Sequence, residues 1–252
     1  MNYNKILKIP NSSILNKRLT KSFFLKNFAL SSAEKSFLNS NIESMELVAE
    51  ISTNSANIPQ YVDDNSSYER IYVITCKLPI NTLSKFATKC IELIQGYIPY
   101  HILLIIQDEN EFVINACNKR INKNDTTKRV IEEDFTTPVI NKLFKTDIVS
   151  DLYEAVNYSV LDKMNMQAIF NSYIQSIVRY KTASITGSFN KRTYSRTEED
   201  VELLKEIELL EADIRYFKAQ IKKETQISDK VELNIKIQEN RKQIETIKNK
   251  LL

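Results

Sequence analysis

The chain has 252 residues, of which 42% are hydrophobic, with 35 basic and 32 acidic residues and a formal net charge of +3. This length allows one substantial core and a separate helical appendage. The near-neutral charge does not by itself imply an acidic partner, and two glycines are too few for Gly-rich phosphate loops or β-propellers.

The three cysteines, Cys76, Cys90 and Cys117, lie in apolar stretches without C-x-x-C spacing. This pattern predicts buried free thiols in a reducing compartment. The first residues lack the apolar run of a signal peptide, and no segment approaches the roughly 18 apolar residues of a membrane span. We therefore expect a soluble, cytoplasmic protein with no membrane partner.

The first 33 residues of the chain are basic, and a short helix and a strand are predicted to follow them. Residues 1–33 contain no acid, and Ser31 with Glu34 forms a capping-box pattern that predicts a short helix through Leu38. Residues 45–51 are predicted to be a strand, and residues 54–67 a polar loop.

Residues 70–117 alternate between strand and helix patterns. The β-branched run at 70–78 predicts a strand. An amphipathic helix over 81–95, ended by Gly96, is followed by strands at 101–107 and 112–117 with a turn between them. The expected fold class is α+β, with a largely antiparallel sheet and packed helices.

The pattern becomes helical from about residue 139, with a break near 163–166. Residues 181–197 contain no acid and mix Ser, Thr and Gly with bases, so we interpret them as a mobile or partly ordered connector. The predicted domains are an α+β domain (1–138), a helical segment with a basic connector (139–196) and a coiled-coil helical hairpin (197–252).

The hairpin is predicted from two apolar ladders with 4-3-4-3-4 spacing, the a/d pattern of paired helices. The first ladder consists of Leu203, Ile207, Leu210, Ile214, Phe217 and Ile221, and the second of Leu233, Ile237, Asn240, Ile244, Ile247 and Leu251. The two are out of phase, which favours a chain that folds back near 224–229. We expect Thr197 with Asp200 to cap the first helix and Asp229 with Glu232 to cap the second. We expect these ladders to bind a partner protein or another copy, and a self-packed hairpin is the alternative.

Acid-free stretches and a basic cluster suggest contact with the backbone of nucleic acids. The candidate residues are Lys17, Arg18, Lys21, Lys119, Arg120, Lys123 and Arg129. An ordinary solvated surface is the alternative interpretation.

No common catalytic or nucleotide-binding motif is present, and we expect no catalytic residue, cofactor or metal site. The lone His101 is interpreted as structural. A diverged PD-(D/E)XK-type metal-dependent nuclease would use Glu50, Asp63 or Asp64, and Lys77. However, Thr75 stands where that motif requires a second carboxylate.

Several short motifs resemble a bacterial family known as domain of unknown function 4391. They are Asn16-Lys17-Arg18 with Lys21-Ser22-Phe23-Phe24, residues 42–51 and 57–59, Ile98-Pro99-Tyr100, and residues 116–122, 222–226 and 230–234. The resemblance implies a gene setting beside helicases and DNA methyltransferases of restriction-like or anti-phage loci, and it implies no chemistry.

These observations lead to three hypotheses. The first is a non-enzymatic accessory subunit of a DNA-defence or restriction-like assembly, which docks a helicase or DNA methyltransferase through its coiled coil and contacts the DNA backbone. The second is the diverged nuclease, and the third is a self-assembling structural protein.

Overall fold

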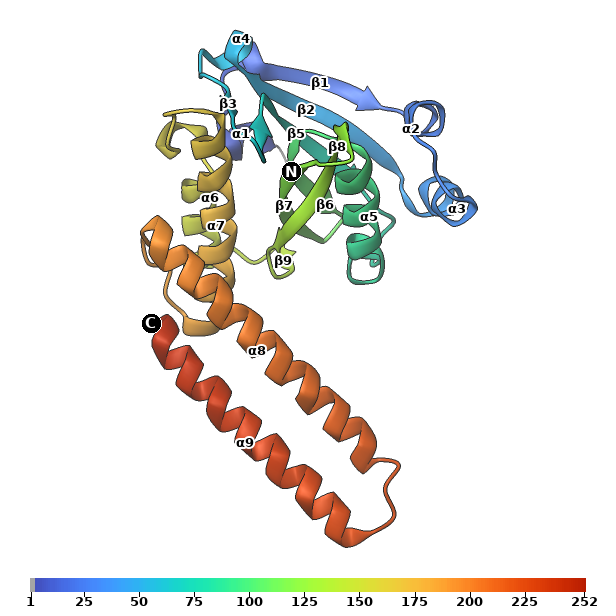
Figure 1. The fold of residues 1–252 in the computed structure, drawn as a ribbon, viewed down its shortest axis with the longest axis vertical. Coiled ribbons are helices and arrows are strands. Elements are labelled where there is room, and N and C mark those ends of the chain that lie inside the picture. The colour runs from blue at the N-terminus through green and yellow to red at the C-terminus, as the bar shows by residue number, and fades with distance from the viewer. Residues whose placement is uncertain (1–2) are drawn as a thin grey trace. The chain divides into compact units, whose positions relative to one another are not determined.

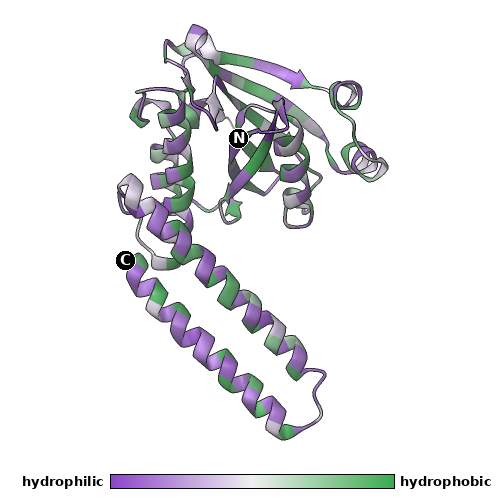
Figure 2. Ribbon diagram, in the orientation of Figure 1, coloured by the Kyte–Doolittle hydropathy of each residue, from purple (hydrophilic) through white to green (hydrophobic). Residues whose placement is uncertain are grey.

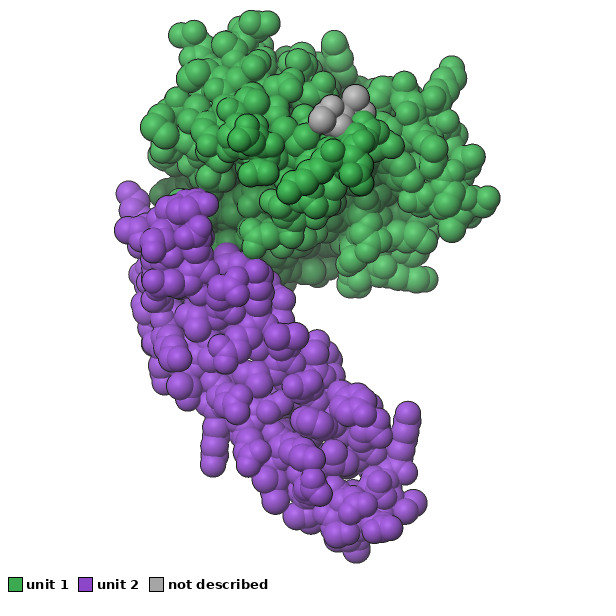
Figure 3. Space-filling model, in the orientation of Figure 1, with its two compact units in different colours: residues 1–180 green, residues 181–252 purple. Residues whose placement is uncertain are grey.

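The computed structural model describes residues 3–252, and the side chains of all of them except residues 126 and 127. The fold is α+β, as the sequence predicts. A mixed sheet in the N-terminal half is followed by helices, and the last two helices pack against each other (Figure 1). The chain consists of two compact units, unit 1 (residues 1–180) and unit 2 (residues 181–252) (Figure 3).

The sheet of unit 1 has the order β1-β2-β5-β6-β7-β8, with β9 paired to β7. Its strands are β1 (Ile14–Leu19), β2 (Ser44–Ser52), β5 (Arg70–Lys77), β6 (His101–Gln107), β7 (Glu111–Asn122), β8 (Asp125–Thr136) and β9 (Ile140–Asn141). The strands β3 (Tyr61–Val62) and β4 (Ser67–Tyr68) form a separate small sheet.

The strand pairs are antiparallel except β5 and β6, which are parallel. The helix α5 (Leu83–Tyr97) connects these two strands, as a parallel crossover requires. Gly96 lies inside α5, and its predicted role as the helix cap is wrong, because Ile98 occupies that position.

Helices cover both faces of the sheet (Figure 1). Helix α5 packs on one face, where Cys76, Cys90 and Leu104 share an apolar core with other residues of β5, α5 and β6. Helices α6 (Asp147–Ala155) and α7 (Met166–Thr186) reach the other face, where Phe112 of β7 contacts Tyr153 and His101 of β6 contacts Phe170. The sheet is therefore buried on both sides, which explains the continuous apolar runs of β5 and β6.

Short helices surround this core. They are α1 (Tyr3–Leu7), α2 (Lys21–Asn27), α3 (Ser32–Asn41) and α4 (Thr53–Ala56), with single 3-10 turns at Asn11–Ser13 and Tyr158–Val160. The predicted capping box of α3 is confirmed, since the Ser31 hydroxyl accepts from the Glu34 amide and the Glu34 carboxylate accepts from the Ser31 amide.

Unit 2 contains α8 (Tyr194–Ile221) and α9 (Ile227–Leu251), joined by a turn at 222–226. The hairpin turn is thus close to its predicted place, but both predicted helix starts are wrong. Thr193 caps α8, with its hydroxyl accepting from the Arg196 amide, and α9 starts after Gln226 without a side-chain cap. None of the helices in the described chain is apolar over a sufficient length to traverse a bilayer.

Candidate functional site: the helical hairpin

The buried seam of the hairpin is built from the two predicted ladders. Ile207 and Ile214 of α8, and Ile237, Ile244 and Ile247 of α9, are all exposed by 8% or less. The remaining ladder side chains are half-buried, apart from the buried Leu251; these half-buried residues are Leu203, Leu210, Phe217, Ile221, Leu233 and Asn240. The ladders therefore pack α8 on α9, which is the self-packed alternative, and the seam is not an open surface for a partner.

Charge distribution favours the antiparallel arrangement of the two helices. Residues 198–213 of α8 contain eight acids and one base, whereas residues 241–250 of α9 contain four bases and one acid. Because the chain reverses at 222–226, these two segments run side by side (Figure 1). Opposite charges along neighbouring helices stabilise this pairing and disfavour a parallel one.

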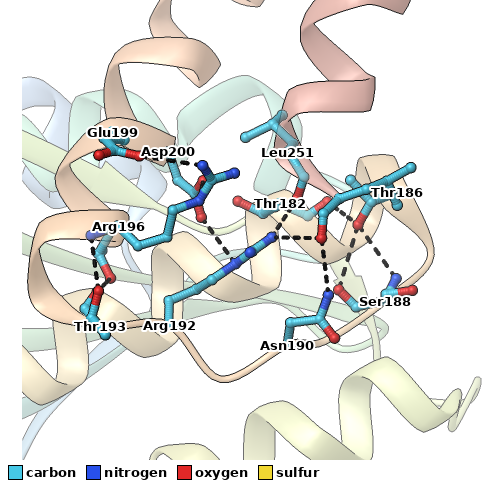
Figure 4. Close-up of polar contacts among 12 residues, drawn as sticks. Thr182, Thr186, Ser188, Asn190, Arg192, Thr193, Arg196, Glu199, Asp200 and Leu251 are labelled. Atoms are coloured by element: carbon cyan, nitrogen blue, oxygen red, sulfur yellow. Dashed lines mark hydrogen bonds and ion pairs between the residues drawn. The ribbon is translucent and has the colours of Figure 1, made fainter.

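A polar clamp closes the base of the hairpin, and it consists of Arg192, Arg196 and Asp200 (Figure 4). The Nε atoms of Arg192 and Arg196 lie 3.3 Å and 3.1 Å from the two carboxylate oxygens of Asp200. Both guanidinium groups also donate to the last carbonyls of α9, Arg192 to Leu251 and Arg196 to Lys250. The clamp thus joins the first turns of α8 to the last turn of α9.

The electrostatics of this clamp follow from its position. The C-terminal carbonyls of a helix carry partial negative charge and lack intrahelical donors, so cations bind there favourably. The Asp200 side chain has no exposed surface, and burial raises the pKa of its carboxyl, while the two guanidinium groups oppose that shift. Arg192 and Arg196 therefore have structural partners. Of the predicted mobile or partly ordered connector at 181–197, the structure shows the partly ordered form, because α7 continues to Thr186 and α8 starts at Tyr194.

Apolar side chains also lie on the outer faces of the hairpin, opposite the seam. On α9, Ile227, Val231 and Ile235 are exposed by 79%, 52% and 53%. Their spacing of four residues places them along one side of the helix near the turn, and we call them the tip stripe. Figure 2 shows hydrophobic and hydrophilic residues alternating along both helices, with hydrophobic positions at the turn end.

The predicted basic residues do not form one surface. Lys17 and Arg18 lie on β1 and Lys21 on α2, whereas the other four lie on or between β7 and β8, so the two groups occupy opposite edges of the sheet. Lys17, Arg18 and Lys123 are exposed. Arg120 pairs with Glu132 at 3.2 Å, and the guanidinium of Arg129 donates to the Lys128 carbonyl.

Lys119 is the clearest correction among these residues, because only 2% of its surface is exposed. Its Nζ donates to the carbonyls of Ile98 and Tyr100, at 2.8 and 2.9 Å, and so holds the turn between α5 and β6. Burial lowers the pKa of this amine to about 7. A lysine in this environment cannot contact phosphates on a surface, and its role is structural.

The nuclease hypothesis requires Glu50 and Lys77 to meet at one metal ion, and the structure separates them. Glu50 pairs in register with Tyr72, and Lys77 lies five residues further along β5, opposite Ser44. The two side chains are therefore about 16 Å apart along the strands. Both residues are near the carboxyl ends of their strands. Because β2 and β5 are antiparallel, these two carboxyl ends lie at opposite ends of the strand pair.

Each candidate nuclease residue instead has a local neighbour. Glu50 pairs with Arg70 at 3.4 Å and Lys77 with Glu43 at 2.8 Å. Asp63 accepts from the amides of Asn65 and Ser66 in the β3–β4 turn, beside the exposed Asp64. Within the described residues, no three His, Cys, Asp or Glu side chains converge as ligands of a metal ion would.

His101 and the cysteines lie in the interior of unit 1. The His101 ring stacks on Tyr68 with centroids 3.8 Å apart, and burial lowers its pKa to about 3, so the imidazole is neutral. The three cysteines are free and buried, as predicted, and the sulfur atoms of Cys76 and Cys90 lie 3.1 Å apart.

The residues that the sequence interpretation missed are the clamp and the tip stripe. The sequence predicts Asp200 only as the partner of the Thr197 cap, although an acid four residues after Arg196 is the spacing of an ion pair on one helix face. Ile227, Val231 and Ile235 also have helical spacing. Their signal is weaker than that of the second ladder, which has six members and runs along the other side of the same helix.

Comparison with known proteins identifies a family and no individual relative. No curated protein and no solved structure is significantly similar to the chain. The family model described as Domain of unknown function (DUF4391) matches residues 7–244, which confirms the resemblance seen in the short motifs. Because this match covers nearly all of the sequence, the chain belongs to the DUF4391 family.

Proposed function

We infer that this protein is a non-enzymatic interaction subunit, and that the tip stripe of its helical hairpin docks a partner protein. One observation carries this proposal: three large aliphatic side chains on one side of α9 are at least half exposed while the opposite side of the helix is already packed. Apolar residues grouped on an otherwise charged surface are typical of protein-binding sites.

The hairpin has the mechanical properties that such a role needs. Its seam is apolar except at Asn240, and the clamp fixes its base through Asp200, so the stripe is presented on a preorganised pair of helices. Preorganisation reduces the entropy cost of docking. The assembly that we propose is a bacterial DNA-defence or restriction-like complex in the cytoplasm, with a helicase or DNA methyltransferase as partner, in line with the gene setting that the family resemblance implies. The hairpin would act there as a coiled coil.

The test is affinity purification from the native host followed by mass spectrometry, with the wild-type chain and with Val231→Asp/Ile235→Asp. Both substituted side chains are exposed, so the variant should fold, and it should lose the partner that the wild type retains. The control is Lys236→Asp/Gln243→Asp, which places the same side chains on exposed, polar positions of α9 away from the tip stripe. Equal recovery of the same partner by wild type and by Val231→Asp/Ile235→Asp would refute docking through the tip stripe.

A further inference from the structure

The outer face of α8 carries a second apolar ladder that the seam does not use. Leu209, Ala212, Tyr216 and Ala219 follow a 3-4-3 spacing, and all four are exposed, Leu209 by 69% and Tyr216 by 59%. At about 100° per residue, this ladder lies on the side of α8 opposite Ile207 and Ile214. We call these four residues the outer ladder.

The spacing of the outer ladder is that of an a/d seam, which pairs helices along their length. Its two large side chains alternate with two alanines. A large residue of one helix can therefore pack over a small residue of the other when two helices run antiparallel. The outer ladder is thus complementary to a reversed copy of itself.

Charges along α8 select the same partner and the same direction. Its acids, including Glu206 and Glu208, end at Asp213, and residues 214–223 contain four bases and no acid. An antiparallel second copy centred on the ladder, at residue 214, places Glu206 and Glu208 alongside residues 220–222 of that copy, where Lys222 is the base. A parallel copy would instead place acids beside acids, which is unfavourable.

We propose that the outer ladder is the interface of a two-fold symmetric homodimer in which the α8 helices of two copies run antiparallel. Such an interface is isologous, because the same surface serves both subunits. The tip stripe lies on α9 and stays outside this contact, so the dimer neither requires nor excludes the partner docking proposed above.

Light scattering coupled to size exclusion tests the assembly with the full-length chain. The wild type should have the mass of a dimer, and Leu209→Glu/Tyr216→Glu the mass of a monomer with an unchanged circular dichroism spectrum. The control Val231→Glu/Ile235→Glu makes the same change on α9 and should stay dimeric. A monomeric wild type, or a dimeric Leu209→Glu/Tyr216→Glu, would overturn the proposal, and a dimer lost only in the α9 variant would assign self-association to the tip stripe.

Electron-spin distance measurements test the direction of pairing. Glu202 is exposed and lies twelve residues from the centre of the outer ladder, so nitroxide labels on Glu202→Cys in an antiparallel dimer should be roughly 36 Å apart along the helix axis, at 1.5 Å per residue. A parallel pair would instead bring the two labels next to each other. Labels on Asp213→Cys, an exposed position beside the centre and outside the ladder, should be close together. The native cysteines are buried, so the unsubstituted chain is the labelling control. A short distance at Glu202→Cys would contradict the antiparallel arrangement.

Discussion

The carboxylate of Asp200 lies 3.3 Å from Nε of Arg192, and the aspartate side chain that makes this contact has no exposed surface. Arg192 precedes α8, and its guanidinium also reaches the carbonyl of Leu251 at the end of α9. A loop residue is thus bound to both helices of the hairpin. This explains why the segment before α8 is ordered although it is rich in Ser, Thr and bases, since Arg192 and Arg196 both pair with Asp200.

Removing the central acid should loosen the base of the hairpin. Asp200→Ala leaves two guanidinium groups without their counter-ion, and we expect a loss of about 3 kcal/mol, the lower end for buried pairs, because Arg196 is 30% exposed. Hydrogen exchange should accelerate in residues 241–252. The control is Glu199→Ala, which removes an exposed partner of Arg196 and should cost less than about 1 kcal/mol. Equal effects of the two substitutions would show that Asp200 does not organise the clamp.

The seam and the outer faces should respond differently to truncation. Ile214→Ala removes a buried side chain and should destabilise the hairpin by about 2–5 kcal/mol. Leu209→Ala removes a side chain that is 69% exposed and should change the stability of the monomer by less than about 0.5 kcal/mol. Urea denaturation followed by circular dichroism, at concentrations where the chain is monomeric, compares the two. Similar losses would mean that Leu209 is packed within the hairpin.

The buried amine of Lys119 predicts an unusual dependence of stability on pH. Its pKa is about 7 in the folded chain and about 10.4 when unfolded. Between these values the unfolded chain binds the proton more readily, so the contribution of Lys119 to stability rises with pH, by at most about 1.4 kcal/mol per pH unit. Below pH 7 both states are protonated and this dependence disappears.

The measurement is the free energy of unfolding of wild type and of Lys119→Met from pH 6 to about pH 9. The difference between them isolates Lys119, because the buried thiols and tyrosines titrate in both proteins. The variant also loses the hydrogen bonds to Ile98 and Tyr100, which lowers its stability at every pH. A difference that stays constant with pH would show that Lys119 keeps an ordinary pKa.

Much of the sheet was predictable because its central elements have unambiguous periodicity. Strands β2, β5 and β6 and helix α5 were all placed within a few residues, and the capping box of α3 was identified from Ser31 and Glu34. The two ladders of the hairpin were equally clear. In each case the signal is local, so a single segment contains enough information to define its own structure.

The remaining features depend on pairings that no single segment specifies. Strand β8 has a charged sequence without apolar alternation and forms only because β7 pairs with it. Lys119 resembles a surface lysine until the turn at Ile98 and Tyr100 provides carbonyls for it. The candidate site shows the same limit. The ladders predicted that α8 and α9 pair, but which side of each helix would stay free depends on how they pack.

DNA binding, if it follows the exposed bases, should depend on the β1 edge. Lys17 and Arg18 are exposed, and two phosphate contacts correspond to a slope of about −2 in log affinity against log salt concentration. Lys17→Glu/Arg18→Glu should remove this salt dependence. Arg120→Glu should leave it unchanged, since Arg120 already pairs with Glu132. A slope that depends on Arg120 and not on Lys17 and Arg18 would move the contact to the β7–β8 edge.

The most direct test of docking through the hairpin is photo-crosslinking in the native host. A photoreactive amino acid is placed at Ile235 in the tip stripe or, as the control, at Gln243 on another side of the same helix, and both positions are exposed. We expect a single heavy adduct from position 235, containing this chain and one partner protein, and little or none from position 243. The absence of an adduct at 235, or equal adducts at both positions, would contradict the proposal that the tip stripe binds a partner.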